Sequence, residues 1–211
     1  MREAAFSLDG LLEHDAELNP TVCYTDTHGY TEVVMAVAAL LGFDLAPRIK
    51  DIKDQTLYKM DRQQTFPNLD PILTGTIKTH LVQQAWDETV RVVASIQDRI
   101  VSASLILHRL GSYARQNSIH QALAEIGRVH KTIHILKTLD DEEYRRRMGR
   151  ELNKGEASHA LSRFLCFGKE GHLRGREFGD QRHTFSCLSV LHNAVVAWNT
   201  LHNGRVVEEL R

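Results

Sequence analysis

The sequence has few cysteines, no long apolar run and almost no net charge. Its three cysteines, Cys23, Cys166 and Cys187, are odd in number and form no C-x-x-C pair, which excludes a disulfide-stapled mini-fold and favours a reduced, cytoplasmic protein. The longest apolar stretch, residues 33–41, is far shorter than the ~20 residues that cross a bilayer. The basic start and apolar run of a secretion signal are also missing. We therefore expect no membrane association.

Common nucleotide-binding and hydrolase motifs are absent as well. The sequence contains no Walker A loop, no G-x-G-x-x-G and no G-x-S-x-G. Its 211 residues are 42% hydrophobic and 25% charged, a composition that excludes disorder and a collagen-like chain. The length suits one elaborated domain or two small ones.

The net charge of -1 argues, taken alone, against a nucleic-acid binder. The charges are unevenly distributed, however, because residues 1–44 carry a net charge of -7 and residues 144–182 a net charge of +5. A basic segment can neutralise phosphates while a carboxylate-rich segment binds cations. A solvated helix face is the commoner reason for a basic run, so charge alone leaves nucleic-acid binding open.

The first part of the chain alternates between short strands and one apolar helix. Residues 21–25 are β-branched and aromatic and predict a strand. Residues 31–41 are apolar around most of a helix and predict a buried helix that ends at Gly42 in a left-handed cap. Residues 43–52 predict a second strand, in which Pro47 favours a sheet edge or the start of a strand. This order indicates a βαβ unit with a parallel sheet.

The remaining chain is mainly helical in pattern. Residues 55–75 predict a loop-rich connector, and residues 77–139 predict two or three packed helices. Residues 155–167 predict a further helix, which a basic, glycine-punctuated loop up to Gly179 separates from a last helix that carries Phe185 and Trp198.

Two carboxylates have positions that suit chemistry. Asp26 follows the first predicted strand, where ligands gather in open α/β sheets and where a carboxylate could hold a divalent cation. Alternatively, Asp26 or Thr27 caps the next helix. Glu156 could face a bound metal, or it could complete a capping box that begins at Asn153.

Two other arrangements are weaker candidates. His130 and His134 have the i, i+4 spacing of metal ligands, but without an evident third ligand we predict a surface pair. Cys23 lies in a probable buried strand, which favours packing over a nucleophilic role.

Several ordered motifs across nearly the whole chain resemble one family. They are YTDTHGYT at 24–31, LGF at 41–43, APRIKD at 46–51, LGSY at 110–113, RQN at 115–117, LNKGEA at 152–157, QR at 181–182, and NAVV followed by WNT within 193–200. Together they resemble the catalytic part of the replicative transposases of class II transposons, the ampicillin-resistance and gamma-delta kind.

The resemblance implies an α/β, ribonuclease H-like fold with an Asp-Asp-Glu (DDE) triad. It places Asp26 as the second Asp and Glu156 as the Glu, with a large all-α insertion between them. Such a triad binds two Mg²⁺ ions that promote nicking and strand transfer at transposon ends. The implied partners are double-stranded DNA, both terminal inverted repeats and target DNA, and the implied location is the bacterial cytoplasm, at the nucleoid.

The chain departs from the family in lacking a match to the first Asp, and Asp9 matches a different family position. We expect a piece truncated at both ends, with an incomplete two-metal site, a core that lacks its first strands, and no activity by itself. The expected parts are a partial core at 1–54, a helical insertion at 55–150 and C-terminal helices at 151–211. Candidate phosphate contacts are Arg48, Arg115, Lys154, Arg163, Arg174, Arg176 and Arg182.

Two rival functions remain open at this point. The first is a non-catalytic DNA-binding or regulatory remnant, which would associate with itself or with full-length transposase. The second is a metal-dependent phosphodiesterase unrelated to transposition, which would need a third carboxylate close to Asp26 and Glu156.

Overall fold

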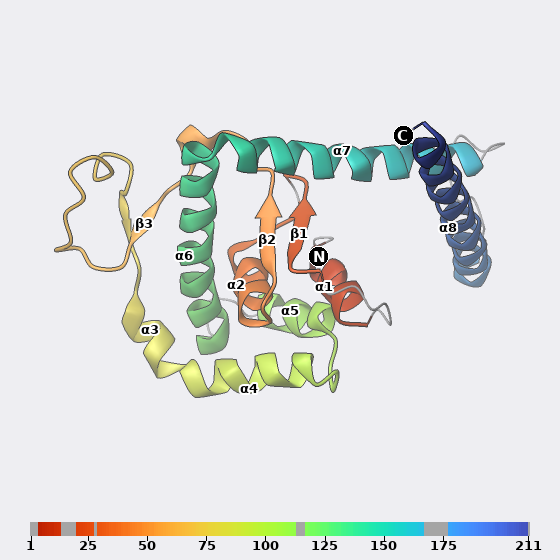
Figure 1. The fold of residues 1–211 in the computed structure, drawn as a ribbon. Helices are drawn as coiled ribbons and strands as arrows, with labels where there is room; N and C mark the ends of the chain where they lie inside the picture. The colour runs from red at the N-terminus through yellow and green to blue at the C-terminus, as the bar shows by residue number, and fades with distance from the viewer. Residues whose placement is uncertain (1–3, 14–19, 28, 113–116, 167–176, 211) are drawn as a thin grey trace. The chain divides into compact units, whose positions relative to one another are not determined.

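The computed structural model describes residues 4–13, 20–27, 29–112, 117–166 and 177–210. The chain forms two compact units, residues 1–149 and residues 150–211, and each is described by itself (Figure 1). Among the described residues, no helix is both long and apolar enough to cross a membrane.

The first unit contains the predicted βαβ arrangement. Strand β1 (Val22–Thr25) pairs in parallel with β2 (Asp44–Pro47), and helix α2 (Glu32–Leu40) connects them. The register runs from Val22 opposite Asp44 to Thr25 opposite Pro47. The strand–helix–strand prediction is therefore confirmed, with a second strand shorter than expected because Pro47 ends it.

Local side-chain and backbone chemistry determines where α2 begins and ends. The Thr31 hydroxyl accepts a hydrogen bond from the Val34 N–H at 3.2 Å, so Thr31 is the N-cap. At the other end Gly42 has φ of 88°, and the Phe43 N–H donates to the Ala38 carbonyl at 2.8 Å. This is the Schellman arrangement that the glycine predicts, and it turns the chain directly into β2.

Helix α1 (Ala4–Glu13) is continuous through Asp9 and Gly10, although Asp-Gly is a common turn dipeptide. The Asp9 carboxylate instead caps helix α5 (Ala103–Ser112), since it accepts hydrogen bonds from the first two main-chain N–H groups of that helix, Ala103 at 2.5 Å and Ser104 at 3.3 Å. This cap joins segments more than 90 residues apart in sequence. The core of the unit lies beside it and includes the buried side chains of Leu8, Val37, Ile96 and Leu123.

Short elements link β2 to the helices that follow. They are a 3-10 turn (Ile52–Asp54), strands β3 (Tyr58–Lys59) and β4 (Gly75–Thr76), and helices α3 (Thr79–Gln84), α4 (Trp86–Gln97), α5 and α6 (Ser118–Asp140). The described part of residues 77–140 thus holds four helices rather than the two or three predicted. Helix α6 lies alongside α2 (Figure 1), with Gly127 so close to the Glu32 main chain that a Cβ would overlap it.

Helix α7 (Glu142–Leu165) starts in the first unit and continues into the second, where α8 (Phe178–Glu209) follows. The helix predicted from residue 155 therefore begins 13 residues earlier than expected. Its start is marked by Asp141, whose carboxylate accepts a hydrogen bond from the Tyr144 N–H at 2.9 Å. Within the helix, Gly149 and Gly155 are tolerated at a modest cost in helix propensity.

Candidate active site

Asp26 lies immediately after β1, at the carboxyl end of the parallel strand pair, and its side chain is exposed. The chain turns here, since the Gly29 N–H donates to the Asp26 carbonyl at 3.2 Å. The alternative in which Asp26 or Thr27 caps α2 is wrong, because Thr31 occupies the N-cap position. Ligand sites in open α/β sheets lie at this end of the strands, so the carboxylate stands in a suitable place for a cation.

Arg48 lies at the same edge of the sheet. Thr25 and Pro47 are opposite one another in the register, so Asp26 and Arg48 are the next residues on adjacent strands. The Arg48 N–H donates to the Thr25 carbonyl at 2.8 Å, and its side chain is exposed. The strand edge thus presents a carboxylate and a guanidinium at corresponding positions.

Glu156 lies in the middle of α7 and is exposed. The capping-box alternative is wrong, because the helix begins at Glu142 and residues 153–156 have no helix terminus to cap. Asp26 and Glu156 belong to different units. Among the described residues, no group of three His, Cys, Asp or Glu side chains surrounds a possible metal position.

The predicted phosphate contacts divide into three sets. Arg48, Arg163 and Arg182 are exposed. Lys154 is also exposed, but its ammonium pairs with Glu151 at 2.7 Å, which agrees with the solvated-face interpretation for that residue. Arg115, Arg174 and Arg176 lie outside the described residues.

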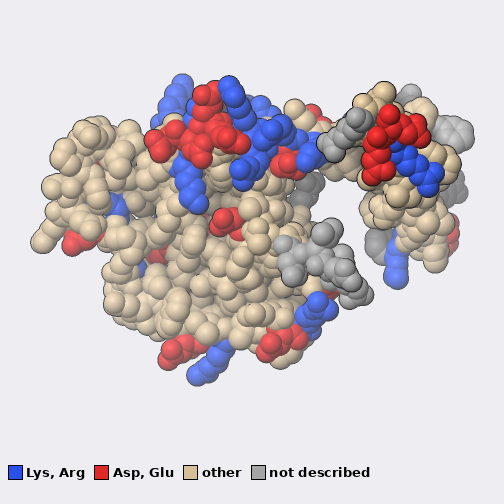
Figure 2. Space-filling model, viewed as in Figure 1, with Lys and Arg blue, Asp and Glu red and all other residues tan. Residues whose placement is uncertain are grey.

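The beginning of α7 carries further basic side chains (Figure 2). Arg145 donates to the Thr138 carbonyl at 2.7 Å, near the end of α6, and Arg146 pairs with Glu142 at 2.7 Å. Arg147 and Arg150, three residues apart along the helix, are exposed and form no ion pair with the described residues. Their i, i+3 spacing would have singled them out as phosphate contacts if the helix had been predicted from residue 142.

The sequence predicted that His130 and His134 on α6 form a surface pair, and this prediction is wrong. His134 is buried, with Nε2 2.8 Å from the Pro47 carbonyl oxygen and Nδ1 2.9 Å from the Tyr144 hydroxyl. Both ring nitrogens therefore have protein partners and neither is free for a metal. His130 is half-buried. In β1, burial raises the pKa of the Cys23 thiol, which agrees with a packing role because a protonated thiol is a poor nucleophile.

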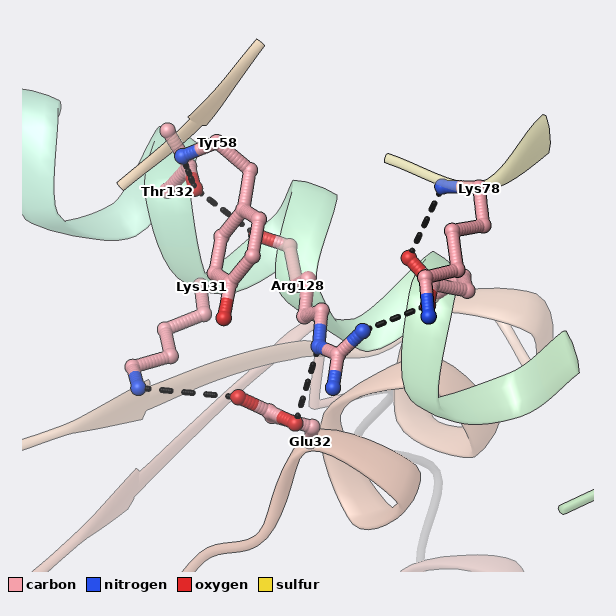
Figure 3. A network of polar contacts seen from close by, with 7 residues as sticks. Glu32, Tyr58, Lys78, Arg128, Lys131 and Thr132 are labelled. Carbon is pink, nitrogen blue, oxygen red and sulfur yellow. Dashed lines mark hydrogen bonds and ion pairs between the residues drawn. The ribbon is translucent and has the colours of Figure 1, made fainter. Parts of the chain in front are cut away.

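A polar network that the sequence did not reveal joins α2, α6 and the connector (Figure 3). The buried Glu125 carboxylate accepts hydrogen bonds from the Lys78 N–H at 3.0 Å and from the Arg128 guanidinium at 2.5 Å. Arg128 also lies 3.4 Å from Glu32 and 5.3 Å from the centre of the Tyr58 ring. Both oxygens of the Glu125 carboxylate have partners, which makes its buried charge tolerable, and the network holds α6 against the first turn of α2.

Comparison with known proteins decides which family this arrangement belongs to. The family model described as the Tn3 transposase DDE domain matches residues 1–211. The chain belongs to this family.

The curated relatives are transposases from several bacteria. The chain is 46% identical to the transposase for transposon Tn1546 of Enterococcus faecium over 207 residues, which are 98% of this chain and 21% of that protein. It is 42% identical to the transposase for Tn501 of Pseudomonas aeruginosa and 34% identical to the transposase for gamma-delta of Escherichia coli (strain K12), each over 100% of this chain and 21% of the relative. This DDE domain therefore spans about a fifth of the length of these relatives.

Proposed function

We propose that this DDE domain is the catalytic part of a replicative transposase, which nicks and joins DNA at transposon ends, and that Asp26 and Glu156 are two of its three catalytic carboxylates. In this proposal β1, α2 and β2 belong to a ribonuclease H-like core, and the helices between β2 and α7 are an insertion. The observation that carries the proposal is the exposed Asp26 carboxylate at the carboxyl end of a parallel strand, in a chain that matches the family over its whole length.

The donor chemistry of the two residues fits magnesium. Exposed carboxylate oxygens are hard ligands, which Mg²⁺ prefers, and neither the His134 ring nor the protonated Cys23 thiol offers a competing soft ligand. When bound, the metal would activate a water or a DNA 3′-hydroxyl and offset the charge that develops at the phosphate. The motif resemblance assigns only two of the three carboxylates to this chain. We therefore infer that the chain by itself does not cleave DNA.

Arg48 has a defined task at this edge. A DNA phosphate that approaches the Asp26 carboxylate meets a charge of its own sign, which raises the cost of approach. The exposed Arg48 guanidinium, at the corresponding position on the adjacent strand, can bind phosphate oxygens through two N–H groups and so offset that repulsion. We assign Arg48 to phosphate orientation rather than to bond making.

The remaining basic residues suit contact with the DNA backbone. Arg147, Arg150, Arg163 and Arg182 are exposed on α7 and α8. None of them forms an ion pair with a carboxylate in the described part of the chain, so their guanidinium groups can bind phosphates. Such contacts hold a duplex in place without reading its sequence.

The alternative is a non-catalytic DNA-binding protein that associates with intact transposase. The exposed apolar side chains of α8, among them Trp198 and Leu201, favour it, because such side chains are normally covered by protein. Co-purification of this chain with a full-length transposase, lost when Trp198 and Leu201 are changed to Ser, would support this second function.

Calorimetric titration with Mg²⁺ tests the metal site. The unmodified chain, Asp26→Asn and Glu156→Gln are compared with the control variants Asp87→Asn and Glu143→Gln, which alter exposed carboxylates on α4 and α7. We expect the first two substitutions to weaken binding by at least about tenfold each, since loss of even an outer-shell partner of a metal ligand costs roughly 10–100-fold in affinity, and the controls to change nothing. Equal affinity in all five proteins would overturn the proposal.

A further inference from the structure

His134 is a buried histidine with two fixed partners. It lies on α6 with 5% of its surface exposed, and its Nε2 is 2.8 Å from the Pro47 carbonyl oxygen. A carbonyl oxygen only accepts, so Nε2 must carry the ring proton. In the neutral ring Nδ1 is then an acceptor, and the Tyr144 hydroxyl, 2.9 Å away, donates to it. The geometry therefore specifies one tautomer.

The surroundings of His134 and Tyr144 keep both side chains neutral. Burial lowers the pKa of His134, an effect that nearby Lys137 increases and that Asp44 and the Pro47 hydrogen bond oppose. Burial, with help from Asp44 and Tyr24, raises the pKa of Tyr144 to about 12. His134 and Tyr144 line a small cavity of about 40 Å³, and the half-buried His130 lines it too.

Pro47 is the last residue of β2 and lies opposite Thr25 at the carboxyl end of the strand pair. The β1–β2 pair has only four residues in each strand, and a short two-stranded pair is marginally stable without packing support. Proline has no N–H to donate, so the end of β2 is joined to β1 by the Arg48 N–H, which donates to the Thr25 carbonyl. The bond from His134 holds the Pro47 carbonyl just before that link.

We propose that His134 is a positioning residue, which holds the carboxyl end of β2 and thereby the edge that presents Asp26 and Arg48. The proposal rests on the proposed function, since it gives His134 a role at the metal and phosphate edge. His134 acts through Pro47 and touches neither metal nor DNA. Tyr144 has a supporting role, because its hydroxyl fixes the tautomer that donates to Pro47.

Amide hydrogen exchange at the two ends of β2 distinguishes this role from general stability. The Arg48 N–H donates to Thr25 at the carboxyl end, and the Asp44 N–H donates to Thr21 at the opposite end, both at 2.8 Å. In His134→Leu we expect the Arg48 amide to exchange roughly fivefold faster, the change expected for one lost hydrogen bond, with the Asp44 amide nearly unchanged. Equal acceleration at both ends, or none at Arg48, would overturn the proposal.

Three further proteins sharpen the test. His134→Gln keeps an amide donor for Pro47 and should restore slow exchange at Arg48. The control His130→Leu, one turn away on the same helix, should leave it slow. In the unmodified chain the nitrogen chemical shifts of His134 should show the proton on Nε2. A proton on Nδ1 in that measurement, which requires no variant, would contradict the proposal by itself.

The Mg²⁺ titration separates this proposal from the function on which it rests. We expect His134→Leu to weaken Mg²⁺ binding severalfold and His134→Gln to retain it. If the unmodified chain binds Mg²⁺ through Asp26 and His134→Leu binds it equally well, the positioning role is wrong. If the unmodified chain shows no Mg²⁺ binding that depends on Asp26, the proposed function fails, and the role of His134 at a metal-binding edge fails with it. Amide hydrogen exchange at Arg48 still reports whether His134 holds the end of the strand.

Discussion

Gly127 shows how a single residue determines the packing of the first unit. A Cβ at this position would overlap the main-chain carbonyl of Glu32, so only glycine lets α6 approach the first turn of α2 this closely. The contact also brings the Arg128 and Lys131 side chains to 3.4 and 3.7 Å from the Glu32 carboxylate. Close approach and charge pairing therefore depend on the same residue.

Substitution of Gly127 by Ala should destabilise the protein by about 1–3 kcal/mol, the usual cost of overpacking. Gly149 is the matched control, because it lies within a helix with open space around its Cβ position. Gly149→Ala should stabilise by about 0.5–1 kcal/mol through helix propensity. Urea denaturation of both variants measures the two effects, and a Gly127→Ala variant as stable as Gly149→Ala would rule out the close contact.

At the scale of elements, α6 concentrates three histidines whose charging is unfavourable in the folded state. Burial lowers the pKa values of His120, His130 and His134, and an unfolded chain has histidines with pKa near ~6.5. The unfolded chain therefore binds more protons below about pH 7, so the stability of the α6 packing is lost as the pH falls.

We expect the free energy of unfolding to decrease between about pH 7 and pH 5, with a smaller decrease in His134→Leu, which has one histidine fewer to charge. Urea denaturation at several pH values measures it. An unfolding free energy that rises as the pH falls through this window would be incompatible with buried neutral histidines on α6.

Sequence patterns identified the elements whose signals are local. The strand at residues 22–25, the helix after Thr31 and the cap at Gly42 follow from β-branched residues, apolar coverage and glycine chemistry, and the structure has them. The sequence could not reveal the Asp9 cap of α5, because Asp9 and Ala103 are distant in sequence. It could not reveal the Glu125–Arg128 network either, because Glu125 also binds the Lys78 N–H, which only the tertiary structure brings near. The sequence did not predict the start of α7 at Glu142, because Gly149 and Gly155 lower the helix propensity of this segment.

The same division holds for the candidate site. The position of Asp26 after a strand was predictable, because it depends on one short segment. The corresponding positions of Asp26 and Arg48, just after the paired residues Thr25 and Pro47, required the strand register, and the burial of His134 required the contact between α6 and β2. For Glu156 the local sequence left a metal ligand and a capping box open, because the start of α7 at Glu142 was not apparent, and only the motif resemblance placed it in the triad.

For the whole molecule, the uneven distribution of charge leads to a prediction about the DNA binding that we propose. The net charge is only -1, yet exposed arginines occur along α7 and α8. Binding through such residues releases counterions from the duplex, so affinity should fall steeply as salt is added.

Arg163→Gln should reduce the slope of log affinity against log salt by about 1, the contribution of one phosphate contact. Arg62→Gln changes the net charge equally, but at an exposed residue of the connector between β3 and β4, and should leave the slope unchanged. Fluorescence anisotropy with a labelled DNA duplex measures both. Equal slopes for the two variants would remove Arg163 from the DNA-binding surface.

The central claim is our proposal that Asp26 and Glu156 are two carboxylate ligands of one metal. Mn²⁺ prefers the same oxygen ligands as Mg²⁺ and broadens the NMR signals of nearby amides. We predict that Mn²⁺ broadens the amides of Thr27 and Ala157 together, and that Asp26→Asn abolishes both effects. Broadening at only one of the two amides, or broadening at Ala157 that survives Asp26→Asn, would contradict a shared site.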